Sequence, residues 1–228
     1  MVSKKQNAQQ QILTPEQDKF LELISRNKYV RERFYFTGGT PLSAFYLQHR
    51  LSEDIDFFSE KEIYLPSVRG FIKKIQNALR IQKVDYTNFL GLHSFQLYFP
   101  DRTILKVDFN YYPFPRIEKG IKYKHIAVDS ILDIAVNKVH TIAMKPRARD
   151  FIDIYFIIKE KKYDFRELLA KAKVKFDWHI DPIQLGSRLF QATQVKDFPR
   201  MIKKINHQDW QDFFLAEARK LKKEILTN

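Results

Sequence analysis

Residues 50–58 read Arg50-Leu51-Ser52-Glu53-Asp54-Ile55-Asp56-Phe57-Phe58. Residues two apart on a β-strand share a face, so Asp54 and Asp56 would point one way while Ile55 and Phe57 point into a core. Two parallel carboxylates repel each other and dislike partial burial, and a divalent cation relieves both problems. Mg²⁺ prefers such oxygen ligands and bridges carboxylates to substrate phosphates. The pair alone is also typical of a solvated strand edge, so it has to be weighed with the segments on either side.

A glycine pair follows the strand expected before this segment. Phe34-Tyr35-Phe36 reads as a short buried strand, and Gly38-Gly39-Thr40 comes directly after it. Glycine lets the backbone turn sharply and approach a ligand closely. The short helix expected from Pro41 to Gln48 would begin with free N–H groups that can bind phosphate. The alternative is an ordinary strand–turn–helix connection.

A third candidate carboxylate lies on a later strand. Residues 103–109 alternate, with apolar side chains on one face and with Lys106 and Asp108 on the other. If this strand lies near the first pair in the sheet, Asp108 joins Asp54 and Asp56. Three acids on one patch suit a two-metal phosphoryl-transfer site. A routine amphipathic strand with a Lys–Asp surface is the alternative.

A lysine lies on the apolar stripe of an expected helix. Asp129-Ser130 can cap a helix that runs to about Met144, and its apolar residues fall on one broad arc at 100° per residue. Lys138 falls inside that arc, where it must either snorkel or find an anion. A phosphate beside a metal site would serve as that anion. Snorkelling at the edge of the stripe is the alternative.

The next helix begins after Pro146 and is apolar on nearly every side, which predicts a central place in the fold. Arg147 with Asp150, and Arg149 with Asp153, have helical ion-pair spacing. Acids on a helix this buried need partners. One interpretation is a set of internal salt bridges, and the other makes Asp150 or Asp153 a catalytic or lysine-positioning group. The residues themselves leave both open.

The elements predict an α+β protein in two parts. Thr14-Pro15 reads as the start of a helix to about Lys28. A helix is expected over residues 66–80, and strands over residues 34–36, 54–58, 82–88, 93–99 and 103–109. Beyond Asp129 the pattern is helical almost to the end. We therefore expect a mixed β-sheet lobe with flanking helices over residues 1–128, followed by a helical lobe over residues 129–228 that completes the active site.

The composition of the 228 residues limits the classes of function. The formal net charge of +13 favours a polyanionic partner such as nucleic acid, a nucleotide or an acidic membrane surface. The absence of cysteine excludes disulfides, Cys-ligated zinc and cysteine nucleophiles. Residues 1–11 are polar without an apolar signal core, and no apolar run reaches about 18 residues. We therefore expect no membrane span, and cytoplasmic residence is the default.

Taken together, these segments resemble the AbiEii/AbiGii toxin family of nucleotidyltransferases, within the DNA polymerase β-like superfamily. The resemblance rests on four segments in the expected order, which together cover residues 36 to about 158. They are Gly38-Gly39-Thr40 through Asp54-Ile55-Asp56; Lys106-Val107-Asp108; Asp133-Ile134 through Lys138; and Arg147 through Asp150 and Asp153. Each segment is a weak signal, and their order and spacing together are fairly specific.

The resemblance implies a nucleotidyltransferase-type sheet lobe, Mg²⁺ with Mn²⁺ as an alternative, and a nucleoside triphosphate as substrate. Many relatives are toxins of toxin–antitoxin or phage-defence pairs, and some transfer nucleotides to tRNA ends. RNA is therefore the expected acceptor, and a cognate antitoxin protein is an expected partner.

The resemblance also implies roles for individual residues. The triphosphate would be held by Gly38, Gly39 and Thr40, and the metal by Asp54, Asp56 and the superfamily's third carboxylate, Asp108. Lys138 and Arg147 would contact the nucleotide, and Asp150 would act near the reaction centre. The superfamily pattern is often Gly-Ser; here Gly39 takes the place of the serine, and Thr40 offers a hydroxyl one residue later.

Residues beyond about 160 carry basic runs at Lys159–Lys162, Lys171–Lys175 and Lys220–Lys223, interspersed with Trp178, Phe190 and Trp210. Such a mixture is compatible with RNA binding, and a solvated helical surface over a packed core is the simpler interpretation of each run.

Two other functions remain open from the sequence. The same site could transfer a nucleotide or a phosphate to a protein hydroxyl. The chain could also be a non-catalytic module that binds RNA or a partner, although clustered carboxylates argue against that reading.

Overall fold

The structure, a computed structural model, describes residues 12–226, and of residues 222–226 the backbone alone. The sequence predicted that residues 1–11 contain no signal segment, and these residues lie outside the described part. The side chains of Lys222 and Lys223, in the last basic run, also lie outside it. The chain divides into two compact units. The first comprises the described residues up to Gln48 together with Ser52–Ser130, and the second comprises His49–Leu51 and the chain from Ile131 onward.

The first unit is built on a mixed seven-stranded sheet with the order β3-β4-β5-β2-β1-β7-β6. Pairing is parallel between β2 and β5 and between β1 and β7, and antiparallel elsewhere. The strands are β1 (Tyr35–Thr37), β2 (Ile55–Ser59), β3 (Lys83–Phe89), β4 (Leu92–Tyr98), β5 (Ile104–Tyr111), β6 (Lys122–Tyr123) and β7 (Ile126–Val128). The expected α+β fold with a mixed sheet is therefore confirmed.

The helices of this unit follow the sequence signals closely, except that the first expected helix is divided. They are α2 (Pro15–Ser25), α3 (Lys28–Arg33), α4 (Gly39–Pro41), the π-helix η1 (Leu42–Leu47) and α5 (Leu65–Leu79). Thr14 and Gln17 form the capping box that starts α2. The single helix expected to about Lys28 is divided, because Asn27 accepts a hydrogen bond from the Val30 backbone and caps a second helix.

One face of the sheet carries the hydrophobic core. Phe36, Phe57 and Phe109 come from β1, β2 and β5 and have no exposed surface. The ring of Phe57 lies between the other two, with centroid distances of 5.5 Å to Phe36 and 5.4 Å to Phe109. Apolar side chains of α2, α3 and α5 join the same core, which fixes the opposite face of the strands as the polar one.

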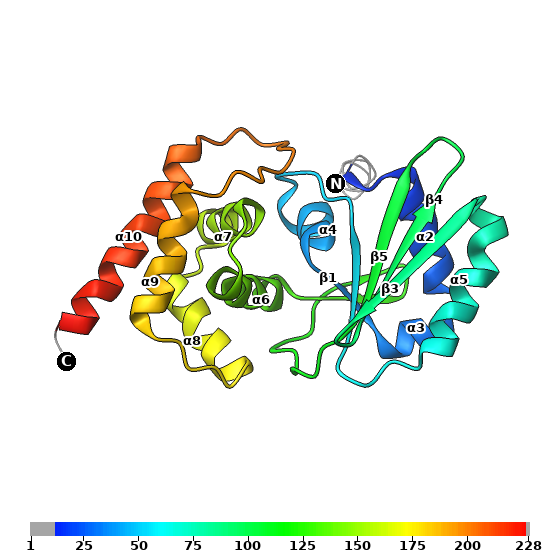
Figure 1. The fold of residues 1–228 in the computed structure, drawn as a ribbon, viewed down its shortest axis with the longest axis horizontal. Coiled ribbons are helices and arrows are strands. Elements are labelled where there is room, and N and C mark those ends of the chain that lie inside the picture. Colours follow the sequence, from blue (N-terminus) through cyan, green and yellow to red (C-terminus); the bar gives the residue numbers. More distant parts are fainter. Residues whose placement is uncertain (1–11, 227–228) are drawn as a thin grey trace. The chain divides into compact units, whose positions relative to one another are not determined.

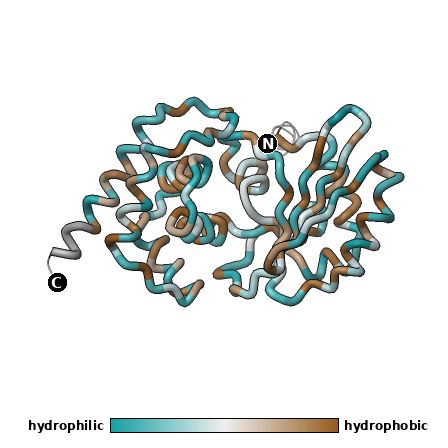
Figure 2. Tube along the Cα trace, in the orientation of Figure 1, coloured by the Kyte–Doolittle hydropathy of each residue, from teal (hydrophilic) through white to brown (hydrophobic). Residues whose placement is uncertain are grey.

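The second unit is helical. Its elements are α6 (Ile131–Met144), α7 (Ala148–Lys161), α8 (Phe165–Lys175), α9 (Pro182–Phe190), the 3₁₀ turn η2 (Gln191–Thr193) and α10 (His207–Leu226), as Figure 1 shows. Figure 2 shows α6 and α7 brown along much of their length, in keeping with the central place expected for α7. Phe151 on α7 packs on Trp210 and Phe214 of α10, and all three are fully buried.

Two features of the fold escaped the sequence prediction. The short strands β6 and β7 were not expected, because five residues of strand give too little alternation to read. The expected short helix at 41–48 is a π-helix preceded by one turn of α-helix, a distinction that periodicity does not make. In the described residues, no helix is both long and apolar enough to cross a membrane.

We expect Phe57→Ala to lower the free energy of unfolding by about 3–5 kcal/mol, because it removes a fully buried ring between two others. Phe89→Ala is the matched control, since Phe89 is 71% exposed on β3, and its change should stay within about 0.5 kcal/mol. Urea denaturation of both variants measures the difference. Equal losses would contradict the core described above.

Candidate active site

A row of polar side chains crosses the face of the sheet that points away from the core. Strand register pairs Thr37 of β1 with Asp56 of β2, Asp56 with Asp108 of β5, and Asp108 with Ser94 of β4. Register partners share a face, so these four residues form one polar row. The structure therefore brings Asp56 and Asp108, which are 52 positions apart in the sequence, side by side on adjacent parallel strands.

Asp54 lies at the start of this arrangement, on the loop just before β2 rather than within the strand. Its neighbour Ile55 pairs with Val107, so continuing the register brings Asp54 alongside Lys106. The hydroxyl of the buried Thr40 donates a hydrogen bond to the Asp54 carbonyl. Thr40 thus ties the glycine turn to the loop that carries the first acid.

Gly38 packs directly against the carboxylate of Asp56. Its φ is +86°, in the left-handed region that L side chains rarely adopt. A Cβ atom at this position would lie 2.5 Å from Asp56 Oδ2. Glycine is therefore required at position 38 for two reasons, the left-handed φ and the close packing against Asp56. The sequence predicted the tight turn; the ligand beside it stays a prediction.

Asp108 is held by two neighbours. The Lys106 ammonium lies 2.6 Å from its Oδ2, and the Ser94 hydroxyl donates to its Oδ1 at 2.6 Å. Burial lowers the pKa of Lys106, but the hydrogen bond to Asp108 and the negative charges of Asp108, Asp54 and Asp56 outweigh it and raise that pKa. All three acids therefore act electrostatically on one ammonium group.

Asp129 extends the polar row, a position that the sequence did not predict. It follows β7, its carboxylate accepts a hydrogen bond from the Thr37 hydroxyl at 2.7 Å, and it is fully buried. The sequence predicted Asp129-Ser130 as the cap of the following helix, and this stays a prediction. The signal that could have identified it is the short apolar run Ile126-Ala127-Val128, whose next residue follows the alternation of a strand.

The donor set fits a magnesium ion held in the usual way. Within the described residues, no three His, Asp or Glu side chains are grouped closely enough to hold a metal by themselves. Mg²⁺ commonly takes one or two carboxylates from the protein and completes its shell with water and substrate phosphate. Asp56 and Asp108, which are register partners on adjacent strands, can supply those two carboxylates.

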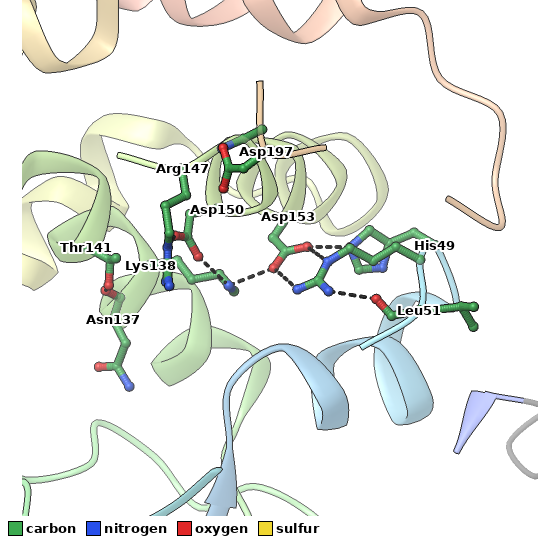
Figure 3. A network of polar contacts seen from close by, with 11 residues as sticks. His49, Leu51, Asn137, Lys138, Thr141, Arg147, Asp150, Asp153 and Asp197 are labelled. Atoms are coloured by element: carbon green, nitrogen blue, oxygen red, sulfur yellow. Dashed lines mark hydrogen bonds and ion pairs between the residues drawn. The ribbon is translucent and has the colours of Figure 1, made fainter. Parts of the chain in front are cut away.

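A second group of charges is buried in the helical unit, and Figure 3 shows it from close by. Lys138 on α6 lies 2.8 Å from Asp150 and 2.6 Å from Asp153, both on α7. Arg147 binds the other oxygen of Asp150 at 2.8 Å. Lys138 is only 8% exposed, so its expected place on the apolar stripe holds, and carboxylates rather than solvent receive its ammonium.

Asp153 is the centre of this network. Arg50 binds both of its oxygens, from Nε at 2.6 Å and from Nη2 at 2.8 Å, and His49 Nε2 lies 2.7 Å away. Burial raises the pKa of Asp153, but the charges of Arg50 and Lys138 hold it well below the ordinary value. The expected pair of Asp153 with Arg149 is wrong, because a guanidinium 103 positions away makes a bidentate contact instead.

The segment His49–Leu51 belongs to the helical unit although the chain on both sides of it belongs to the sheet unit. The His49 carbonyl accepts from the Ile202 and Lys203 backbones, and Leu51 N donates to the Arg200 carbonyl. The segment between the glycine turn and Asp54 is thus fixed by backbone bonds as well as by Asp153. No sequence signal marks it, since all its partners are distant along the chain.

The network has an interior end and an end that reaches solvent. Asp153 has no exposed side-chain surface, whereas Arg147, the partner of Asp150, is 38% exposed. Burial raises the pKa of Asp150, and the charges of Lys138 and Arg147 more than compensate, so its pKa is lowered. Beside Lys138, the buried amide of Asn137 has no hydrogen-bond partner among the described residues.

Comparison with known proteins gives a consistent picture. Residues 22–223 match the family model of the nucleotidyl transferase AbiEii toxins of type IV toxin–antitoxin systems. The chain is 29% identical over 147 residues to the Aquifex aeolicus protein aq_aa25, and this match spans 63% of the chain and 66% of that protein.

Two solved structures share the fold. A candidate nucleotidyltransferase from H. pylori has a TM-score of 0.59 at 17% identity, covering 94% of this chain and 98% of its own. JHP933 from Helicobacter pylori has a TM-score of 0.55 at 17% identity, covering 92% of each chain. At these identities the likeness concerns the fold alone.

We expect Gly38→Ala to disrupt the site, because the new methyl group would meet Asp56 Oδ2 in a backbone conformation that alanine disfavours. Gly70→Ala on α5 is the matched control. A Cβ there meets nothing within 4 Å, so alanine should raise the unfolding free energy by about 0.5–1 kcal/mol. Thermal denaturation with and without Mg²⁺ tests both variants. A Gly38→Ala protein as stable as the parent, with unaltered metal response, would refute the close packing.

We expect Asp153→Asn to lower the unfolding free energy by about 3–5 kcal/mol, since it leaves the buried Arg50 guanidinium without its carboxylate. Asp85→Asn removes one acid of an exposed Lys–Asp pair on β3 and should cause no measurable change. Urea denaturation at neutral pH provides the comparison. If the two substitutions behave alike, the network contributes nothing beyond a surface ion pair.

Proposed function

The chain belongs to the AbiEii family of enzymes, the nucleotidyl transferase toxins of type IV toxin–antitoxin systems, and on that basis we propose its reaction in more detail. It transfers a nucleotide from a nucleoside triphosphate to the 3′ hydroxyl of an RNA, with tRNA among the candidate acceptors. The reaction requires Mg²⁺, for which Mn²⁺ can substitute.

The observation that carries this proposal is the register of β2 with β5. It sets Asp56 beside Asp108 on the polar face of the sheet, with Asp54 one residue before β2 and Gly38 packed on Asp56. Carboxylates brought together in this way repel one another, and their repulsion is relieved by a divalent cation that also binds phosphate. A structural sheet surface gains nothing from such an arrangement.

Asp56 and Asp108 are the proposed direct metal ligands, and Asp54, which the sequence also assigned to the metal, is proposed to act on the same cation through its charge. Bound there, Mg²⁺ would neutralise the triphosphate and lower the pKa of the attacking hydroxyl. Gly38 and Gly39 leave the turn beside Asp56 without side chains, so phosphate oxygens can approach the backbone. Thr40 supports this turn through its hydrogen bond to the Asp54 carbonyl, in addition to any contact with phosphate.

In the helical unit, Lys138 and Arg147 are the proposed contacts for the nucleotide, and the Asp150 carboxylate is proposed to act near the reaction centre. Asp150 is preferred over Asp153 because its partner Arg147 reaches solvent, whereas the oxygens of Asp153 are bound by Arg50, His49 and Lys138 inside the unit. Asp153 then serves to position Lys138.

The RNA acceptor is supported by charge. The helical unit, taken as residues 49–51 and 131–228, contains 21 Lys and Arg against 13 Asp and Glu. Lys159, Lys161, Lys171 and Lys173 are exposed on its helices, whereas Lys175 is buried against Asp133 and does not contribute. Trp210 lies in the core, so stacking on a base is left to side chains such as Phe190, which is 55% exposed.

The family description implies an antitoxin that opposes this protein, and we propose such a protein as a functional partner. We also propose that the enzyme acts in the cytoplasm, where nucleoside triphosphates and RNA are abundant.

We expect the purified protein with Mg²⁺ to transfer label from at least one α-³²P-labelled nucleoside triphosphate to RNA, when each nucleotide is supplied in turn with total RNA. Asp56→Ala should abolish transfer, because the metal loses a carboxylate that holds it at the reacting groups. Asp85→Ala, which removes an exposed strand acid of the same sheet, should transfer label as fast as the parent. Raising the salt concentration should weaken RNA recruitment.

The alternatives give different outcomes. If only protein is labelled, the proposed site stands, and the acceptor is a protein hydroxyl and not RNA. Transfer by Asp56→Ala at the parent rate would refute the proposed metal site. RNA binding without transfer of any nucleotide would identify a non-catalytic binding module.

A further inference from the structure

We propose that the ammonium of Lys106 holds the place among Asp54, Asp56 and Asp108 that a divalent cation takes during the reaction. The metal must therefore displace Lys106 from Asp108, and this exchange sets how tightly the metal binds. The inference rests on the proposed function, because it concerns the same carboxylates.

The contacts of Lys106 are those of a cation at the centre of an acidic site. Its ammonium lies 2.6 Å from Asp108 Oδ2, the oxygen that Ser94 leaves available. The negative charges of Asp54 and Asp56 also act on it. One ammonium group is thus acted on by three carboxylates.

Lys106 is also able to leave. Its side chain is 39% exposed, while that of Asp108 is 8% exposed, so the acid is fixed and the lysine reaches it from the solvent side. The four-carbon stem of lysine lets the ammonium swing into water without moving the strand. Lys138 and Lys175 differ in this respect, because their side chains are 10% and 2% exposed and lie between helices.

A second lysine on the same sheet shows what an ordinary pair of this kind looks like. Lys83 and Asp85 on β3 have the same spacing of two residues, and their charged groups are 2.8 Å apart. Both side chains are well exposed, at 64% and 40%, and Asp85 is the acid whose charge acts on Lys83. The difference at Lys106 lies in the convergence of three acids, not in the local sequence spacing.

The electrostatic consequence has a definite sign. An ammonium that shares carboxylates with a divalent cation both repels it and competes for the same oxygens. Removing the ammonium should therefore tighten metal binding, by about tenfold for one unit charge at this range in a partly solvated site. If Lys106 merely held Asp108 in a useful orientation, its removal would leave metal binding unchanged or weaken it.

For the enzyme, this exchange couples the acidic site to the supply of metal. At low metal concentration Lys106 screens the carboxylates from one another and limits their repulsion. When metal arrives with a nucleoside triphosphate, the ammonium is released into water.

The test is a Mn²⁺ titration followed by electron paramagnetic resonance of the free ion, with Mg²⁺ competition and without nucleotide or RNA. Lys106→Met removes the charge and keeps the apolar stem, and we expect its Kd for Mn²⁺ to fall about tenfold relative to the parent. Lys106→Arg keeps the charge and therefore the competition with Mn²⁺, so its Kd should stay well above that of Lys106→Met. Lys83→Met, the matched control, should leave the Kd unchanged.

Thermal denaturation gives a second readout on the same proteins. Without metal, Lys106→Met should melt below the parent, and saturating Mg²⁺ should raise its Tm by more than it raises that of the parent. If Lys106→Met does not fold, Lys106→Gln removes the same charge and is held to the same expectation. An unchanged or weaker Kd in the charge-free variant overturns the inference.

Failure of the proposed function has a different signature. Asp56→Asn should weaken Mn²⁺ binding in the parent and in Lys106→Met alike. If the parent binds Mn²⁺ and Asp56→Asn does not weaken it, the metal site itself is wrong. If Asp56→Asn weakens binding but Lys106→Met does not tighten it, the metal site stands and Lys106 is only a structural partner of Asp108.

Discussion

Parallel pairing of β2 with β5 brings Asp56 and Asp108 to adjacent positions on one face of the sheet. Like charges this close are unfavourable, and a fold that keeps them needs cations nearby. The surroundings fit that requirement: Lys106 and Ser94 bind Asp108, and the turn at Gly38 has no side chain to cover Asp56. The apolar residues between the acids hold the strands in this register, because a slip of one residue would turn Phe57 outward.

The local part of this arrangement could be read from the sequence. Alternation in residues 54–58 and 103–109 assigns each acid to the polar face of its strand, and burial of Ile55 and Phe57 agrees. The order of the strands could not be read in the same way. It is determined by long-range pairing, and the chain passes through α5, β3 and β4 before β5 returns to β2.

The helical unit shows the same limit for charged side chains. Periodicity placed Lys138 on an apolar stripe and Arg147 one turn from Asp150, and both features are present. It also paired Asp153 with Arg149, since local spacing is the only guide that a sequence offers. A buried carboxylate instead takes the partner with the best geometry, and the bidentate guanidinium of Arg50 comes from a segment that sequence analysis assigned to the sheet lobe.

The two acidic groups of the protein are balanced differently, and this difference separates their roles. Asp153 contacts Arg50, His49 and Lys138, and Asp150 contacts Lys138 and Arg147. These acids therefore already have cationic partners. A divalent ion could bind them only by breaking buried ion pairs. Asp54, Asp56 and Asp108 act together on one half-exposed ammonium, whose flexible stem allows it to move away. Under the proposed function, a metal therefore gains most at the carboxylates of the sheet. In the helical unit, Asp153 and Asp150 instead hold Lys138 and Arg147 through ion pairs.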